Sequence, residues 1–340
     1  MAEPTQDELE SACCLERDDT VPGRPAMSAF RRSARLHQAR WRELHGHPMG
    51  TQPIRPVPPR PSRPVGSRMR LAYAIETGAN LVTPAAFQAV RRRLAIVEPH
   101  QSIDQQRLWA DLTWSSPVAF NLFGEVATDL DSADRVVRSW FPDAPGRVSA
   151  VRFLHSPGRF DPAYLDSLRD FLVAFELDLG DGTHGMIAVD VKFFEVPKAE
   201  QPKPTNVAGY RAVADASAAF VPGSTDRLAQ RTVHCVTWLE HLLLLSMLQH
   251  KSGSWIWGRY LVVHHPDNVD VAEMLDGYRA FLADTTTFHT LRLDDLVESG
   301  VLPAATTDAV RRRYIGPSRR HVDATTPFPV ADTASHRCSG

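Results

Sequence analysis

The spacing of apolar residues predicts helices over much of the chain after residue 69. Thr83-Pro84 predicts a helix start, because threonine is a good N-cap and proline fits the first helical turn. Beyond it, apolar residues recur every three or four positions, the spacing of a buried helix face. The pattern predicts helices starting at residue 83 and over residues 103–112, 117–126, 131–140, 225–250, 269–282, 293–299 and 303–314.

Shorter runs of apolar and β-branched residues predict strands between these helices. Gly180-Asp181-Gly182 is a strong turn sequence, so we expect the runs on either side of it to form a hairpin. The order is helix, three strands, helix, strand and helix, which predicts an α/β fold with a mixed central sheet flanked by helices. The predicted strands are residues 148–154, 171–177, 186–194, 260–263 and 288–291.

The two ends of the chain differ in composition from the middle. Residues 1–68 are rich in Arg, Pro, Gln and His, and closely spaced prolines oppose both helix and sheet. We expect a disordered tail over residues 1–68, a folded domain over 69–316 and a second disordered tail over 317–340. A short basic helix over residues 30–44, acting as an arm that contacts phosphates, is the sharper alternative for the first tail.

Composition and charge narrow the class of protein. The 340 residues carry a formal net charge of -2, so any basic surface that binds nucleic acid must be local. The four cysteines form no CxxC pair, which argues against zinc and favours a reducing compartment. The acidic N-terminus is unlike a signal peptide, and the apolar run 242–248 is too short to span a bilayer. We expect a cytoplasmic protein without a membrane partner.

The second arm of the predicted hairpin ends in Asp-x-Lys. Strand side chains alternate between faces, so Asp190 and Lys192 point the same way. Residues 186–189 are apolar on both faces, which predicts an interior strand where charges are costly unless paired or bound to metal. Asp170 begins the neighbouring arm, and the hairpin can bring it near Asp190. Solvated strand ends and a simple salt bridge are the alternative interpretation.

Two carboxylates and a lysine in one place suit the metal-assisted hydrolysis of a phosphodiester. Carboxylate oxygens can hold Mg²⁺, which polarises a phosphoryl oxygen and activates water. The lysine can hold the attacking water or stabilise the charge that develops on the phosphate.

These pieces together resemble the PD-(D/E)XK nuclease superfamily, and within it a branch of bacterial restriction-endonuclease-like proteins. The resemblance covers residues 69–300 and implies an αβββαβ core. It rests on four pieces in order: Asn121-Leu-Phe-Gly-Glu125, His155-Ser-Pro-Gly-Arg159, the strand acid Asp170, and the strand from Gly185 to Lys192.

The resemblance implies a role for each of these residues. Asp170 and Asp190 would bind the metal, with Mg²⁺ as the cofactor and Mn²⁺ as a substitute, and Lys192 would be the catalytic lysine. Glu125 would be a helix-borne acid that orients water or binds a second metal. The chain departs from the commonest form by carrying Asp190 where Glu is more frequent, and Arg169 before Asp170 in place of an apolar residue.

Other candidate residues lie around this motif. Arg159 and His155 are candidate substrate-binding residues, since Arg159 could hold a phosphate through two hydrogen bonds; a structural turn is the alternative. Glu195 could assist the metal or Lys192. His264 and its neighbour His265 look like half a zinc site, but a strand-end pair is the simpler interpretation because no third ligand is near.

The expected activity is Mg²⁺-dependent endonucleolytic cleavage of DNA. The partner would be nucleic acid, and a homodimer is compatible with it because nucleases that cut both strands often dimerise. One alternative is a catalytically inactive member of the same fold that binds nucleic acid or a partner protein. Another is an unrelated α/β binding module in which the acids and the lysine form a buried ion network.

Overall fold

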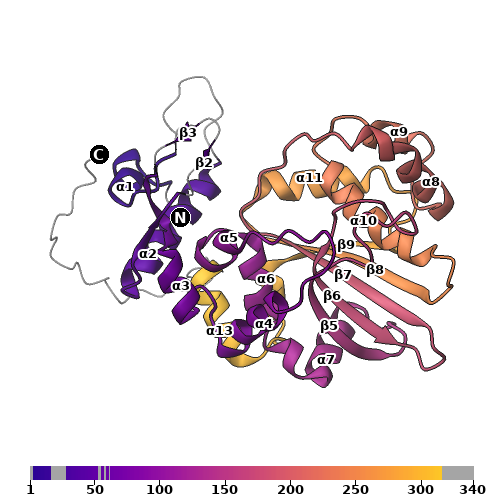
Figure 1. The fold of residues 1–340 in the computed structure, drawn as a ribbon, viewed down its shortest axis with the longest axis horizontal. Helices are drawn as coiled ribbons and strands as arrows, with labels where there is room; N and C mark the ends of the chain where they lie inside the picture. Colours follow the sequence, from indigo (N-terminus) through magenta and orange to yellow (C-terminus); the bar gives the residue numbers. More distant parts are fainter. Residues whose placement is uncertain (1–2, 17–27, 53–54, 57–58, 61, 316–340) are drawn as a thin grey trace. The chain divides into compact units, whose positions relative to one another are not determined.

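The computed structural model describes residues 3–16, 28–52, 55–56, 59–60 and 62–315 (Figure 1). The chain divides into two compact units, each with its own internal contacts. The first comprises Met1–Asn80, Trp109–Thr113 and Val310–Gly340, and the second comprises Leu81–Leu108 and Trp114–Ala309.

The first unit contains helices and short strands in the stretch expected to be a disordered tail. Thr5 forms a capping box with Glu8 at the start of the first helix, and Leu36 and Ala39 on the second helix are buried with Leu9. The expectation of a disordered tail over residues 1–68 therefore differs from the structure, which has helices and short strands in the described part of this stretch. The second expected tail, residues 317–340, lies outside the described residues. The elements are α1 (Gln6–Ser11), α2 (Ala29–Leu44), β1 (Met49–Thr51), β2 (Arg55–Pro56), β3 (Pro59–Arg60), β4 (Pro64–Met69), α3 (Leu71–Thr77) and η4 (Arg311–Ile315).

The second unit holds the remaining helices, most of them where the sequence predicts. The Thr83 side chain accepts a hydrogen bond from the Ala86 amide, with Pro84 in the first turn, as expected. The single helix predicted over 225–250 is wrong, because the backbone of Thr232 pairs with Glu200 and interrupts it. The helices are α4 (Pro84–Leu94), α5 (Gln105–Ala110), α6 (Ser115–Phe123), η2 (Val126–Thr128), α7 (Leu130–Trp140), η3 (Pro204–Asn206), α8 (Val207–Ser217), α9 (Ser224–Leu228), α10 (Cys235–Leu248), α11 (Val269–Arg279), α12 (Leu293–Glu298) and α13 (Ala304–Val310).

A five-stranded mixed sheet forms the centre of this unit. Its order is β5-β6-β7-β8-β9; the first two neighbouring pairs are antiparallel and the last two are parallel. Helices lie on both faces of the sheet (Figure 1), so the expected α/β fold with a restriction-endonuclease-like αβββαβ core is confirmed. The strands are β5 (Arg147–His155), β6 (Phe171–Asp178), β7 (His184–Lys192), β8 (Trp255–His264) and β9 (Phe288–Arg292).

The central strand β7 is buried on both faces, as its apolar sequence predicts. Met186 and Ala188 belong to the core formed with Trp238 and other residues of α10, while Val189 is buried on the opposite face. Asp190 and Lys192 continue the α10-facing row at the end of the strand. Within the part of the chain that is described, none of the helices has the length and apolar character needed to cross a membrane.

Candidate active site

Asp190 and Lys192 form an ion pair at the end of β7. Alternation of strand side chains places both on the face covered by α10, and Lys192 Nζ contacts Asp190 Oδ2. The second carboxylate oxygen, Asp190 Oδ1, accepts a hydrogen bond from the amide of Val191 at 2.9 Å. The two side chains are only 8% and 11% exposed, respectively. The predicted shared face is therefore confirmed, and both charges are largely removed from water.

Helix α10 adds a third charged group to this pair. Glu240 Oε2 lies 3.5 Å from Lys192 Nζ and accepts a hydrogen bond from the Tyr260 hydroxyl at 2.7 Å. Its other oxygen is 3.9 Å from the guanidinium of Arg169. Burial, and after it the charge of Asp190, together raise the pKa of Glu240 to about 7, against the opposing effect of Lys192 and Arg169.

Lys192 is held as a cation by the acids around it. Burial alone lowers the pKa of a lysine, but the charges of Asp190, Glu240 and Glu195 outweigh it and raise the pKa of Lys192 above its ordinary value. A lysine with a raised pKa is a poor base near neutral pH. Its chemical capacity here is that of a fixed positive charge.

Glu240→Gln is expected to flatten the pH dependence of folding stability between about pH 4.5 and pH 7. The folded-state pKa of Glu240 rises from 4.5 to about 7, so the stabilising contribution is complete below pH 4.5 and is lost as the pH rises through 7. The glutamine variant lacks this titration. Urea unfolding at a series of pH values measures the effect, with the exposed Glu273→Gln as the control. An unchanged pH dependence in Glu240→Gln would contradict the assignment.

Asp170 lies just before β6, at the same end of the sheet. The ladder between β6 and β7 pairs Val173 with Val189, so its antiparallel continuation leads from Asp170 toward the end of β7 that carries Lys192. Burial raises the pKa of Asp170, the Arg159 guanidinium lowers it, and the nearby charge of Asp190 adds to the rise. The hairpin thus brings the two predicted acids within electrostatic reach of each other.

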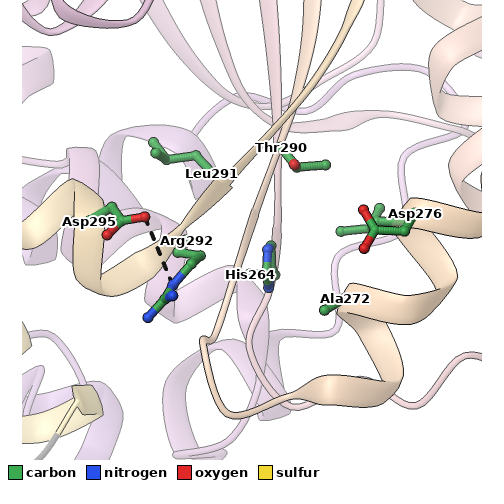
Figure 2. Close-up of a pocket in the computed structure, with 8 residues that line it drawn as sticks. His264, Ala272, Asp276, Thr290, Leu291, Arg292 and Asp295 are labelled. Atoms are coloured by element: carbon green, nitrogen blue, oxygen red, sulfur yellow. Dashed lines mark ion pairs between the residues drawn. The ribbon is translucent and has the colours of Figure 1, made fainter. Parts of the chain in front are cut away.

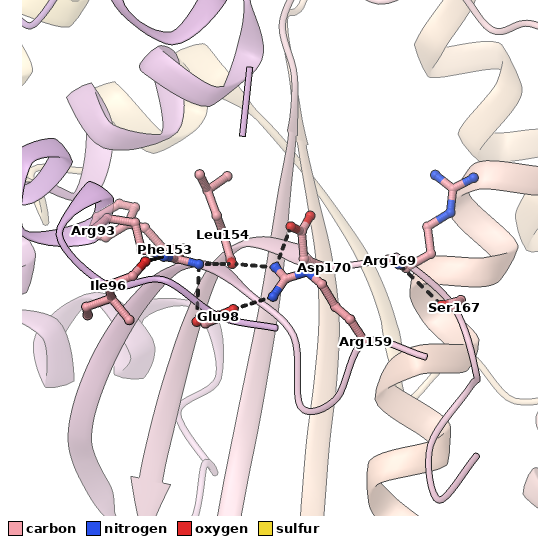
Figure 3. A network of polar contacts seen from close by, with 9 residues as sticks. All are labelled: Arg93, Ile96, Glu98, Phe153, Leu154, Arg159, Ser167, Arg169 and Asp170. Carbon is pink, nitrogen blue, oxygen red and sulfur yellow. Dashed lines mark hydrogen bonds and ion pairs between the residues drawn. The ribbon is translucent and has the colours of Figure 1, made fainter. Parts of the chain in front are cut away.

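Arg159 occupies a buried position between two acids, as Figure 3 shows. Its guanidinium is 2.9 Å from Asp170 Oδ2 and also contacts Glu98, which pairs with Arg93 at 3.1 Å. The carbonyl of Leu154 accepts hydrogen bonds from Arg93 and Arg159, both at 3.0 Å. With a side chain that is 4% exposed, Arg159 is committed to Asp170 and Glu98, so the structure favours the structural alternative to the predicted phosphate contact.

His155, the second predicted substrate-binding residue, ends β5 opposite Phe171 of β6. Burial lowers the pKa of His155 to about 4. The imidazole is therefore neutral at physiological pH and supplies no positive charge for a phosphate. Its place beside the start of β6 suits a role in holding the strand that carries Asp170.

The end of β7 is fixed from the opposite face by the first residue of α6. The Ser115 hydroxyl donates to Glu195 and accepts a hydrogen bond from the Phe193 amide at 3.1 Å. The Asn268 amide group donates to the carbonyl of Glu195 at 3.0 Å. Burial raises the pKa of Glu195, and Lys192 opposes this shift. The negative charge of Glu195 therefore helps to keep Lys192 protonated, which agrees with the expectation that Glu195 could assist Lys192.

Glu125 does not join the other acids. It follows the C-terminal end of α6, ten residues after Ser115, which corresponds to about 15 Å along the helix axis from Ser115. Its carboxylate accepts a hydrogen bond from the Thr306 hydroxyl at 2.6 Å. The expectation of Glu125 as a catalytic or metal-binding acid is corrected here, because the helix runs away from Lys192.

Glu240, Tyr260 and Ser115 were missed by the sequence analysis. Glu240 had a detectable signal: it is a lone acid in the largely apolar run Trp238–Met247, where a buried charge requires a partner. Ser115 and Tyr260 gave no such signal, since their contacts depend on which elements pack together.

The donor set at this edge fits a hard divalent cation. Asp170 and Asp190 supply carboxylate oxygens. A cation between them would offset both the burial that raises the pKa of Asp170 and the smaller repulsion from Asp190. Among the described residues there is no group of three or more His, Cys, Asp or Glu side chains placed to hold one ion. Two carboxylates suffice for Mg²⁺, which keeps several waters and takes further oxygens from a bound phosphate.

A mixed sheet with acids and a lysine at the end of its central strands defines a restriction-endonuclease-like nuclease fold. The chain belongs to the PD-(D/E)XK nuclease superfamily: the model of that family matches residues 24–316. The match begins well before residue 69, the first residue of the resemblance that the sequence motifs indicate. Searches of curated proteins and of solved structures find no match to the chain.

Proposed function

We propose that the protein is a metal-dependent endonuclease that hydrolyses phosphodiester bonds of DNA. The main support is the convergence of Asp170, Asp190 and Lys192 at one end of β6 and β7 in a member of this nuclease superfamily. A homodimer is part of the proposal, because two copies can each supply one active site to one strand of the duplex.

Each residue has a distinct part in the proposed reaction. Asp170 and Asp190 would hold Mg²⁺, or Mn²⁺ in its place; the bound ion polarises the phosphoryl oxygen and lowers the pKa of water. Lys192, kept cationic by Asp190 and Glu240, would stabilise the negative charge that develops on the phosphate. Arg159 orients the Asp170 carboxylate through its contact at 2.9 Å.

Incubation of the purified full chain with supercoiled plasmid tests the proposal. We expect nicking with Mg²⁺ and with Mn²⁺, and none with chelator, because the two carboxylates need the ion to act on phosphate. A parallel incubation with RNA of similar length separates DNA from RNA as the substrate. Cleavage that persists in chelator, or no cleavage under any of these conditions, would contradict a metal-dependent DNA nuclease.

A nuclease fold that binds without cutting is the second candidate. It is favoured by the way the charges already compensate one another: Lys192 lies between Asp190 and Glu240, and Arg159 is paired with Asp170. Such a network can stabilise a fold without any ion. This candidate predicts duplex-DNA binding of equal affinity with Mg²⁺ and with chelator, and no nicking in either.

A further inference from the structure

Arg169 directly precedes the candidate metal ligand Asp170, and its side chain points toward α10. Figure 3 shows this side chain directed away from Asp170 and Arg159. The guanidinium lies 3.9 Å from Glu240 Oε1, on α10, and 3.7 Å from Glu200 Oε2. A positive charge therefore lies beside Asp170 on the side of the sheet that α10 covers.

Glu240 lies between Arg169 and Lys192. One of its oxygens is 3.9 Å from Arg169, and the other is 3.5 Å from Lys192 Nζ, which also contacts Asp190. A single carboxylate thus separates the two cations. A phosphate held by a metal ion between Asp170 and Asp190 would lie close to Arg169, because the Cα atoms of Arg169 and Asp170 are only about 3.8 Å apart.

The donors of Arg169 are open to a ligand. Its contacts at 3.7 and 3.9 Å are too long for hydrogen bonds, and within residues 62–315 the guanidinium donates none. The side chain is 30% exposed, against 4% for Arg159, which lies 2.9 Å from Asp170. Arg169 can therefore reorient toward a ligand at little cost, whereas Arg159 cannot.

A further arginine at this end of the sheet, Arg292, is already paired. It ends β9 and lines a pocket of about 300 Å³, where Figure 2 shows Asp295 beside it. Its Nε donates to Asp294 at 3.1 Å, and a second guanidinium nitrogen contacts the same carboxylate. Two strand spacings, about 10 Å, separate it from Lys192. Arg169 is the better placed of the two for a phosphate at Lys192.

We propose that Arg169 binds a phosphate group of the strand that is cut at Lys192. The inference rests on the proposed nuclease function and adds a substrate-binding residue to it. A guanidinium carries only donors and can bind two phosphate oxygens at once. Hydrogen bonds of about 2.8 Å to phosphate would replace its long contacts with Glu200 and Glu240. Because phosphates are the same at every base pair, the contact should be independent of sequence.

Fluorescence anisotropy of a labelled DNA duplex at a series of NaCl concentrations tests the inference on the full chain, in chelator so that no strand is cut. Arg169→Gln is expected to bind about tenfold more weakly than wild type, as the loss of a charged hydrogen bond predicts. The slope of log Kd against log [NaCl] should fall by about one, because one phosphate contact is lost. Arg169→Lys keeps the charge and should keep the slope.

Nicking of plasmid with Mg²⁺ gives a second readout. Arg169→Gln should raise KM about tenfold and leave kcat within about threefold of wild type, because a contact made before and during the reaction affects binding alone. Both ion pairs of Arg169 are long and partly exposed, so the melting temperature should stay close to that of wild type.

Arg135→Gln is the matched control. Arg135 on α7 also has a long ionic contact, 3.8 Å to Asp129. It lies at the opposite end of the sheet, where the neighbouring Asp134 accepts a hydrogen bond from the amide of Val148 near the start of β5. Its loss removes the same charge from the protein and should leave the salt slope unchanged.

Wild-type affinity and slope in Arg169→Gln would overturn the inference, as would equal losses in Arg169→Gln and Arg135→Gln. A wild-type preference for a G·C duplex over an A·T duplex that Arg169→Gln abolishes would assign the guanidinium to guanine and also reject the phosphate. If Arg169→Gln binds like wild type and wild type nicks plasmid, the assignment of Arg169 alone has failed and the nuclease proposal stands.

Discussion

Lys192→Met is expected to lower the rate of plasmid nicking about 10²–10³-fold. Methionine keeps the length of the side chain but removes the charge that Asp190 and Glu240 hold in place. Loss of one preorganised group that stabilises transition-state charge has an effect of that size. Initial rates of nicking with Mg²⁺, measured beside wild type, give the ratio.

The control for Lys192→Met is Lys251→Met, which removes an exposed lysine and should nick at the wild-type rate. Lys192→Met also leaves the buried carboxylates of Asp190 and Glu240 without their cation. Its melting temperature must therefore lie above the assay temperature for the rates to be compared. Nicking by a folded Lys192→Met within about threefold of wild type would remove Lys192 from the mechanism.

Arg159→Ala is expected to lower the free energy of unfolding by about 3–5 kcal/mol, the cost of removing one member of a buried ion pair. Arg159 contacts Glu98 and Asp170 and donates to the carbonyl of Leu154, all from a side chain that is almost fully buried. Its removal takes this donor from Asp170 and leaves Glu98 and the carbonyl of Leu154 with Arg93 alone. Urea unfolding monitored by circular dichroism measures the difference.

Arg152→Ala provides the matched comparison for Arg159→Ala. Arg152 also pairs with an acid, Glu176, but about half of its side chain is exposed, so its loss should cost no more than about 1 kcal/mol. Equal losses for the two variants would mean that burial of Arg159 does not strengthen its contacts. The role of Arg159 in holding Asp170 would then be rejected.

Much of the fold could be predicted because local sequence decides it. Residues 186–189 are apolar on both faces, so β7 had to be an interior strand, and the Gly180-Asp181-Gly182 turn fixed its partner β6. The same alternation predicted that Asp190 and Lys192 share a face, which their ion pair confirms. These features depend on a few neighbouring residues and on strand geometry alone.

The rest of the site depends on contacts between distant segments. Glu240 lies on α10, about 50 residues after Lys192 along the chain, and only the packing of α10 on the sheet brings the two together. The prediction for Glu125 was wrong because the sequence does not show which end of the helix lies near the strand acids. Glu125 follows the end of α6 that is far from them. Arg159 was assigned to substrate because sequence gives no measure of burial.

The most direct measurement is nicking of supercoiled plasmid by wild type and Asp190→Asn, side by side with Mg²⁺. Asparagine has nearly the shape of aspartate but lacks the charge that a metal ion and Lys192 require. We predict nicking by wild type and none by Asp190→Asn, with both proteins folded at the assay temperature. Equal nicking by the two proteins would contradict a metal-dependent site at the end of β7.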